Sequence, residues 1–206
     1  MSYETLIKEV FELHNKIRTD PKSFIPFLNS QLKNFDELVY RRSDPDSEIE
    51  IETSEGKSAV LEAIEYLKKA KPKETLIINR RLCLAAQRHS EDLGRNGLCE
   101  SVGSDGRFPD ERIKEHLSFS EKIGESLDFN SYTAQDILFS CIVDDGISDR
   151  SRRKNIFSSS YCAIGIGISE HSEYGNCVVF DYVGVSDLKE LENDEINKSK
   201  IYLNNY

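Results

Sequence analysis

The chain has 206 residues, and its 27 Lys and Arg against 37 Asp and Glu give a formal net charge of −10. This acidic balance argues against a protein that binds nucleic acid through phosphate contacts. The length fits one domain of ordinary size with surface insertions, and no apolar run approaches the roughly 18 residues that cross a bilayer.

The N-terminal residues and the cysteines indicate the cellular compartment. The N-terminal residues lack the basic and apolar stretch of a secretory signal, which favours a cytoplasmic protein. A secreted protein is the alternative if a signal was trimmed away. The cysteines are odd in number and have no Cys-x-x-Cys pair, so we expect free thiols and neither a zinc knuckle nor a redox motif. They are Cys83, Cys99, Cys141, Cys162 and Cys177.

Apolar residues recur at helical spacing in several segments, which predicts amphipathic helices with one buried face. Asp20 followed by Pro21 is typical of a helix start, and Pro109 opens a further short helix. Gly146 is expected to stop the last helix. The predicted helices cover residues 3–17, a segment from Pro21, residues 58–69, 79–93 and 132–143.

The second half of the chain contains the strand signals. Residues 162–169 and 177–183 are apolar and β-branched and flank a polar turn, which predicts a β-hairpin. Residues 122–127 are predicted to form a short strand. In contrast, residues 44–55 carry six acids, no base and Pro45, and we interpret them as a solvated excursion.

Helices first and antiparallel strands last indicate an α+β fold and argue against a doubly wound sheet. We predict a single domain over residues 1–187, with a polar acidic insertion near 41–56 and a polar C-terminal tail over 188–206.

His89 is the most informative histidine. Leu82, Ala86 and Leu93 lie three, four or seven residues from it, so its imidazole lies on or beside the buried stripe of its helix. One interpretation is a hydrogen-bonded histidine at the edge of the core. The other is a metal ligand or a base at a cleft, which requires partners from elsewhere in the chain.

Two other segments carry charges that need explanation. Glu125 lies inside an otherwise apolar short strand, and a buried carboxylate needs a cation or several donors. Residues 150–154 place four bases within five positions. Such a run binds a phosphate or a carboxylate, or it forms a solvated loop that pairs with nearby acids. His14 and His116 are expected to be structural or surface histidines, and His171 to be solvated.

These segments, in this order, resemble the CAP superfamily of cysteine-rich secretory proteins, antigen 5 and pathogenesis-related 1 proteins, also called the SCP-like domain. The resemblance runs from about Val10 to Gly184 and is closest to the variant of protists and other non-animal lineages. It rests on Leu13-His14-Asn15-Lys16-Ile17-Arg18, Leu84-Ala85-Ala86-Gln87-Arg88-His89-Ser90-Glu91-Asp92, Gly103-Ser104-Asp105-Gly106, Gly124-Glu125-Ser126-Leu127, Asp144-Asp145-Gly146, Arg153-Lys154-Asn155-Ile156-Phe157 and Gly165-Ile166-Gly167.

The resemblance implies a three-layer α-β-α sandwich with a central antiparallel sheet, and a cleft with two histidines and two acids. In several members the histidines bind zinc or another divalent ion. Matched by motif, the first histidine falls on His89 and one acid on Glu125. The second acid falls in or just after the helix that ends at Asp144 and Asp145.

The chain departs from the family at the second histidine. Where relatives commonly have Arg-Gly-His-Arg-Lys-Asn, this chain has Arg152 at the histidine position. Arginine has no lone pair to offer and stays protonated, so it cannot bind zinc. We therefore expect an incomplete metal site that holds zinc weakly, if at all, through His89 and Glu125. The Arg152 guanidinium is expected to replace the metal's positive charge and to pair with Glu125, Asp144 or Asp145.

These features favour a non-enzymatic binding or interaction module whose degenerate cleft receives an anion, a peptide or a lipid. The cleft residues are His89, Glu125, Arg152, Asp144 and Asp145. The alternative is a peptidase-like hydrolase or a weak divalent-metal site, but the sequence offers no nucleophile beside His89. A further alternative is a domain kept for its surface, in which residues 44–55 contact a partner protein.

Overall fold

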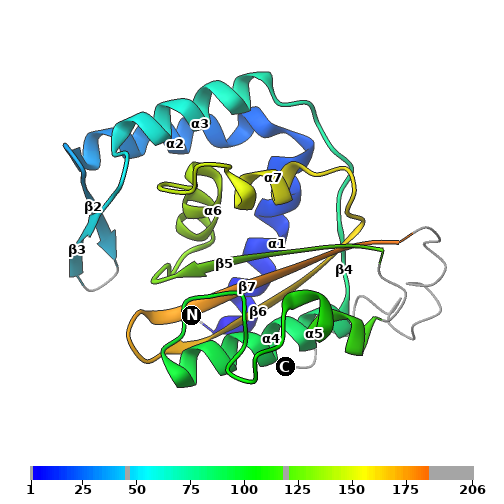
Figure 1. Cartoon of the computed structure of the whole chain (residues 1–206). Helices are drawn as coiled ribbons and strands as arrows, with labels where there is room; N and C mark the ends of the chain where they lie inside the picture. Colours follow the sequence, from blue (N-terminus) through cyan, green and yellow to red (C-terminus); the bar gives the residue numbers. More distant parts are fainter. Residues whose placement is uncertain (1, 45–46, 118–120, 186–206) are drawn as a thin grey trace.

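The computed structural model describes residues 2–44, 47–117 and 121–185, and it is a three-layer α-β-α sandwich, as predicted (Figure 1). Helices α4 and α5 cover one face of a four-stranded sheet, and α1, α6 and α7 cover the other. The helices are α1 (Tyr3–Thr19), α2 (Ile25–Gln31), α3 (Lys57–Lys69), α4 (Arg80–Asn96), α5 (Pro109–His116), α6 (Ala134–Val143) and α7 (Ser151–Phe157).

The central sheet has the strand order β4-β6-β7-β5. The predicted hairpin is confirmed as β6 (Ala163–His171) and β7 (Gly175–Gly184), and β5 (Lys122–Phe129) pairs antiparallel with β7. The two-residue strand β4 (Ile77–Ile78) pairs parallel with β6, so the otherwise antiparallel sheet has one parallel edge. The predicted tail over 188–206 lies outside the described residues.

Helix α4 packs directly against strand β6 because two glycines leave room for its backbone. A Cβ atom on Gly165 would lie 2.2 Å from the carbonyl carbon of Leu82, and one on Gly167 would lie 2.3 Å from the amide nitrogen of Gln87. Any side chain larger than hydrogen at either position would push the helix away from the sheet. This close approach fixes the position of His89, which lies further along the same helix.

The other face of the sheet carries the main hydrophobic core, which α1, α3 and α6 build with β6 and β7. His14 of α1 is buried in it and its Nε2 lies 3.2 Å from the Tyr182 hydroxyl. Burial, reinforced by nearby Arg18, lowers the pKa of His14 to about 3, so this histidine is a neutral core residue. His171, expected to be solvated, is 4% exposed because its ring packs under the β6–β7 turn and its Nε2 lies 3.1 Å from the Leu98 carbonyl.

Two segments differ from the sequence prediction. Residues 44–55, expected to be a solvated excursion, lie largely in a β-hairpin of β2 (Val39–Asp44) and β3 (Ser47–Glu52), which joins the short strand β1 (Phe35–Asp36) in a second sheet. Figure 1 shows this hairpin projecting beside the main sheet. The basic run, for which a solvated loop was one interpretation, forms the helix α7. The five cysteines are free thiols, as predicted.

Candidate functional site

His89 and Glu125 meet in a closed cluster between the sheet and helices α4 and α5. The Nε2 atom of His89 lies 3.8 Å from the Oε2 atom of Glu125, and the two side chains are only 1% and 3% exposed. His89 extends from α4, and Glu125 extends from the edge strand β5 toward the same face. The sequence therefore identified a real pair, although the pair is sealed from solvent.

Two residues that the sequence analysis did not single out complete this cluster. Arg112 of α5 donates through Nη2 to Glu125 Oε2 at 2.6 Å. Asp181 lies directly opposite Glu125 in the β5–β7 register and is 2% exposed. Asp181 lies within the apolar run of β7, and an acid at such a position signals a buried polar site. Arg112 supplies the cation that the buried Glu125 requires.

Burial controls the protonation of this cluster. Burial lowers the pKa of His89 to about 4, and the Arg112 charge acts in the same direction, so the imidazole is neutral at pH 7. Burial also raises the pKa of Glu125 and, with the help of the Glu125 charge, raises that of Asp181 well above its ordinary value. Arg112 supplies the positive charge that lies against this pair of buried carboxyl groups.

Several polar atoms in the cluster have no hydrogen-bond partner among the described residues. They are both ring nitrogens of His89, Oε1 of Glu125 and Oδ1 of Asp181. Even so, the described part of the chain contains no group of three or more His, Cys, Asp or Glu that fits a metal ion. The Oε2 atom that faces His89 is already bound to the positively charged Arg112. A zinc ion would meet charge repulsion there, so these residues fit the metal poorly.

Asp144 and Arg152 form a second cluster, on the α6 and α7 side of β5. Asp144 caps α6 in a left-handed conformation, with φ 56° and ψ 42°. The helix therefore ends at Asp144 and not at Gly146, where the sequence analysis expected its end. Its fully buried carboxylate accepts the backbone N–H groups of Arg152 at 2.9 Å and Arg153 at 3.2 Å. The Nε atom of Arg152 donates to it at 2.6 Å. Arg152 therefore pairs with Asp144, which is one of the three partners that the sequence analysis expected.

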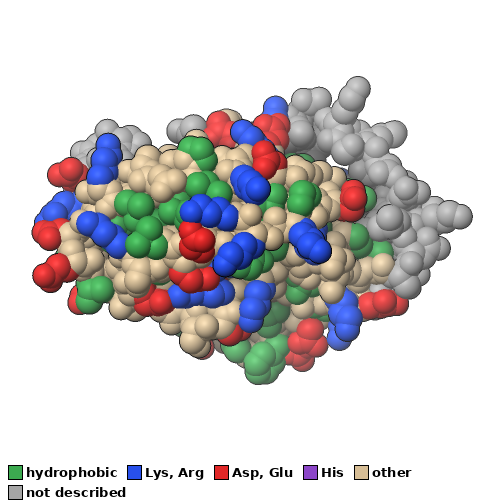
Figure 2. Space-filling view, turned by 90° about the horizontal axis from the view of Figure 1, so that it is seen from above, with side chains coloured by type: hydrophobic (Ala, Val, Ile, Leu, Met, Phe, Trp, Pro, Cys, Tyr) green, Lys and Arg blue, Asp and Glu red, His purple; other side chains and the backbone are tan. Residues whose placement is uncertain are grey.

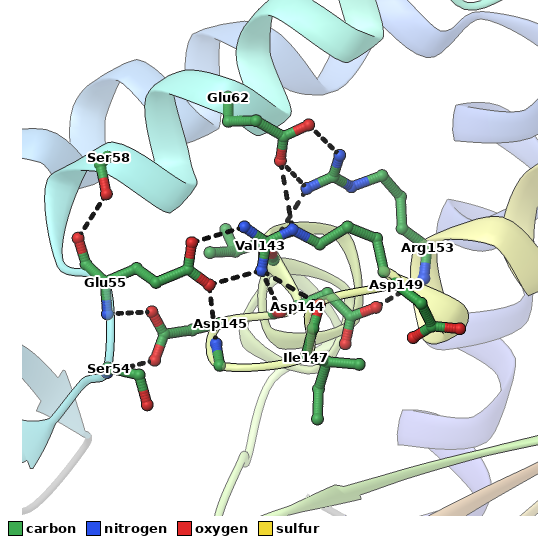
Figure 3. A network of polar contacts seen from close by, with 12 residues as sticks. Ser54, Glu55, Ser58, Glu62, Val143, Asp144, Asp145, Ile147, Asp149 and Arg153 are labelled. Atoms are coloured by element: carbon green, nitrogen blue, oxygen red, sulfur yellow. Dashed lines mark hydrogen bonds and ion pairs between the residues drawn. The ribbon is translucent and has the colours of Figure 1, made fainter.

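The rest of the basic run anchors α7 to α3 (Figure 3). Arg153 donates through Nη1 and Nη2 to both carboxylate oxygens of Glu62, at 2.7 and 2.5 Å. Arg150 binds Glu55 in the same bidentate way, at 2.6 Å for each bond. On the face seen in Figure 2, basic and acidic side chains accordingly lie side by side instead of in one basic patch. The interpretation of this run as bases paired with nearby acids matches the geometry.

Asp145 has a structural position too. Its two carboxylate oxygens accept the backbone N–H groups of Ser54 at 2.6 Å and Glu55 at 2.9 Å, just before α3 begins (Figure 3). The five expected cleft residues therefore do not line one cleft. Glu125 points toward α4 and α5, whereas Arg152 approaches the outer edge of β5 from α7 and donates to the Leu127 carbonyl at 3.2 Å.

A pocket of about 160 Å³ lies beside Arg152, between the β2–β3 hairpin, α6 and the end of β5. Arg152 and Arg42 line it together with the aromatic side chains of Phe35, Tyr40 and Phe139. The sequence analysis missed this pocket because it did not expect the hairpin that forms one of its walls. Of the expected site residues, Arg152 and Asp145 contact this hollow in the surface.

The fold and the two clusters define a class of protein: an α-β-α sandwich with a buried His–acid pair under one face of the sheet and an arginine at its edge. The family model of the cysteine-rich secretory protein family, CAP, matches residues 11–182. The chain therefore belongs to the CAP family. A search of curated proteins gives no match.

Two solved structures are similar to this chain. An outer surface protein from Borrelia burgdorferi is 15% identical with a TM-score of 0.47, and the match covers 54% of this chain and 78% of that one. An extracellular protein containing an SCP domain from Bacillus anthracis str. Ames is 14% identical with a TM-score of 0.45, and the match covers 61% of this chain and 38% of that one. At these TM-scores the family assignment rests on the family model. In the described part of the chain, no helix has the length and apolar character needed to cross a membrane.

Proposed function

We propose that this chain is a non-enzymatic binding or interaction module of the CAP type, and that it binds at the pocket beside Arg152. The observation that carries this proposal is the closure of the His89–Glu125 pair. A general acid or base must reach the substrate, and these side chains are 1% and 3% exposed. Glu125 is bound to Arg112, and His89 is neutral with no hydrogen bond to orient it.

A cysteine nucleophile is another route to a hydrolase, and the geometry of Cys99 argues against it. The Sγ atom of Cys99 lies 3.9 Å from Nε2 of His171. However, Nδ1 of His171 accepts the N–H groups of Glu173 and Tyr174, so the ring proton of the neutral imidazole lies on Nε2. That nitrogen cannot take a proton from the thiol. Burial also raises the pKa of Cys99, which disfavours the reactive thiolate.

The alternative to our proposal is a weak zinc site at His89 and Glu125, and a zinc titration distinguishes the two. We would titrate the metal-free protein with zinc by calorimetry, with His89→Ala as the control. We expect no binding at micromolar zinc, because Arg112 occupies and neutralises Glu125. Micromolar binding that His89→Ala abolishes would overturn the non-metal interpretation and reopen the enzyme alternative.

Arg152→His is the matched variant, since it restores the histidine that relatives have at this position. Arg152 lies beside Asp144 and on the other side of β5 from His89, so we expect the variant not to create a site that includes His89. Zinc binding that requires both His89 and the new histidine would show that the two clusters meet, contrary to our proposal. Cleavage of a diverse peptide library, lost in His89→Ala, would contradict it as well.

The proposal leaves the ligand as an anion, a peptide or a lipid, and it names no nucleic-acid partner because the net charge is −10. The pocket is what supports a small ligand. The site of action stays a prediction from the sequence, and the two similar structures are described as outer-surface and extracellular proteins, which lends no support to a cytoplasmic address.

A further inference from the structure

The pocket beside Arg152 has an aromatic wall. The ring centroids of Phe35 and Tyr40 lie 4.7 Å apart with an interplanar angle of 30°, and those of Tyr40 and Phe139 lie 5.2 Å apart at 23°. The three stacked rings all line the pocket. Because the rings cover each other's faces, they offer the pocket an apolar surface that includes ring edges, and another aromatic ring packs well against such edges.

Arg152 adds a positively charged donor to the same lining. Its Nε atom is bound to Asp144, and its Nη1 atom donates to the Leu127 carbonyl at 3.2 Å and the Ser140 hydroxyl at 3.3 Å. The Nη2 atom of Arg152 forms no hydrogen bond with any described residue, and the Arg152 side chain is 22% exposed. The guanidinium is therefore held in place with the N–H groups of Nη2 left over, and a positively charged N–H donor binds a carboxylate oxygen strongly.

Most acids that line the pocket are already engaged. Asp145 accepts two backbone N–H groups, and Asp136 accepts the Thr133 hydroxyl at 2.6 Å. Glu52 lies exposed on the hairpin. Arg42 adds a second positive charge to the lining and donates to the Asn130 carbonyl.

A buried carboxyl group lies behind this lining. Asp128 of β5 is 2% exposed and interacts with Ser131 and Ser140, which both line the pocket. Its Oδ2 atom has no hydrogen-bond partner among the described residues. Arg152 and Arg42 are the cations that act on it, from α7 and β2. An unpartnered buried oxygen beside a pocket marks polar groups that a ligand or a proton completes.

We infer that this pocket binds a small organic carboxylate with a flat apolar body, an inference that rests on the proposed binding function. The ring lies against Phe35, Tyr40 and Phe139, and the carboxylate accepts from Nη2 of Arg152. The volume sets the size, because an apolar cavity of about 150 Å³ holds benzene. The pocket, at about 160 Å³, is of similar size and holds a single aromatic ring, with the carboxylate at Arg152.

Benzoate is the probe that tests this inference, with two matched ligands. Acetate keeps the carboxylate without the ring, and benzamide keeps the ring without the charge. Calorimetry on the full chain is expected to give a benzoate Kd on the order of 0.1–1 mM, and at least about tenfold weaker binding for both matched ligands. Benzamide binding as tightly as benzoate would overturn the role of Arg152 as the carboxylate donor.

Variants place the ligand in the pocket. Ile51→Phe adds bulk from β3 into the pocket and is expected to abolish benzoate binding, whereas Ile49→Phe changes the same strand at a position that does not line the pocket. Arg152→Lys keeps a positive charge for Asp144 but loses the planar fork, and we expect about a tenfold loss of benzoate affinity. Equal benzoate binding in Ile51→Phe and the wild type would overturn the inference, and this variant leaves the Asp144 pair intact.

Failure of this inference is distinguishable from failure of the proposed function. If inorganic phosphate or an acidic peptide binds and Ile51→Phe abolishes that binding while benzoate does not bind, the pocket is a binding site but its ligand is not a flat carboxylate. If benzoate binds and both Ile51→Phe and Arg152→Lys leave the affinity unchanged, the site is elsewhere and both proposals fail.

Discussion

Asp144→Asn tests whether the buried Asp144–Arg152 pair holds α6 and α7 together. The carboxylate is fully buried and accepts from two backbone N–H groups and from Nε of Arg152. Asparagine keeps the shape and tolerates the left-handed backbone at φ 56°, so the substitution isolates the charge. Removing one partner of a buried pair costs about 3–5 kcal/mol, and the 22% exposure of Arg152 moves our expectation to the lower end, about 3 kcal/mol.

The assay is urea unfolding, with Asp149→Asn as the matched control. Asp149 lies exposed on the same loop and, among the described residues, accepts only the Ser151 N–H group, at 3.2 Å, so we expect a loss below about 1 kcal/mol. A loss of about 3 kcal/mol corresponds to a fall in Tm of roughly 6–12 °C for a chain of this size. An Asp144→Asn variant within about 1 kcal/mol of the wild type would refute the role of the buried charge pair.

Three more outcomes follow from the geometry. Because the pKa of His89 is lowered from 6.5 to about 4, the stability that its neutral form contributes is complete above pH 6.5 and is lost as the pH falls toward 4. The unfolding free energy of the wild type minus that of His89→Gln should therefore fall by at most about 3 kcal/mol over this range. A difference that does not change with pH would contradict a buried neutral imidazole. Gly165→Ala should lower the free energy of unfolding in urea by about 3 kcal/mol, because its Cβ would meet the α4 backbone. Gly106→Ala, at a position with φ 81° and no atom within 4 Å of the added Cβ, should lower it by about 1 kcal/mol. Equal losses would mean that α4 shifts freely. Burial raises the pKa of Asp128 to about 6, and the groups that face this carboxyl group are Arg152, Arg42, Ser140 and Ser131. Asp128→Asn should therefore tighten benzoate binding at pH 7 about threefold and abolish the increase in benzoate affinity that the wild type shows toward pH 5. An unchanged pH dependence would place the titrating group elsewhere.

The sequence predicted those elements whose own residues carry a local hydrophobic pattern. The helical stripe around His89 and the β-branched strands of the hairpin are local patterns, and both are confirmed as α4 and as β6 with β7. Helix α7 was not predicted because Ser151–Phe157 has only two apolar residues. Its stability comes from Asp144, Glu55 and Glu62, which are distant in the sequence or lie outside the helix.

The β2–β3 hairpin had a strand pattern in its sequence, but the number of acidic residues led to a different prediction. Residues 48–52 alternate Glu and Ile, which is the period of a half-buried strand. The count of acids favoured a solvated segment, yet Ile51 is half-buried and lines the pocket, while Glu48 and Glu50 are exposed. Alternating positions of a strand point to opposite faces, so Glu48, Glu50 and Glu52 share one face and their number says nothing against a strand.

The site was predictable in its residues and not in its arrangement. Glu125 in an apolar strand signals a need for a cation, but the local sequence does not say which of the chain's 27 basic residues supplies it. Arg152 was expected as one candidate partner, and Arg112 holds the position instead. Strand β5 lies between the two arginines, and only the three-dimensional pairing of β5 with β7 and α7 reveals that separation.

A titration with benzoate followed by NMR, with the imidazole signals of the histidines and the aromatic signals assigned, tests most directly where this module binds. We expect the signals of Tyr40 and Phe139 and the Arg152 guanidinium to shift with one common Kd, while the His89 imidazole stays neutral and unchanged at pH 7. Shifts centred on His89, with the pocket signals unmoved, would contradict a binding site at Arg152 and return the sealed His89–Glu125 pair to consideration as the functional site.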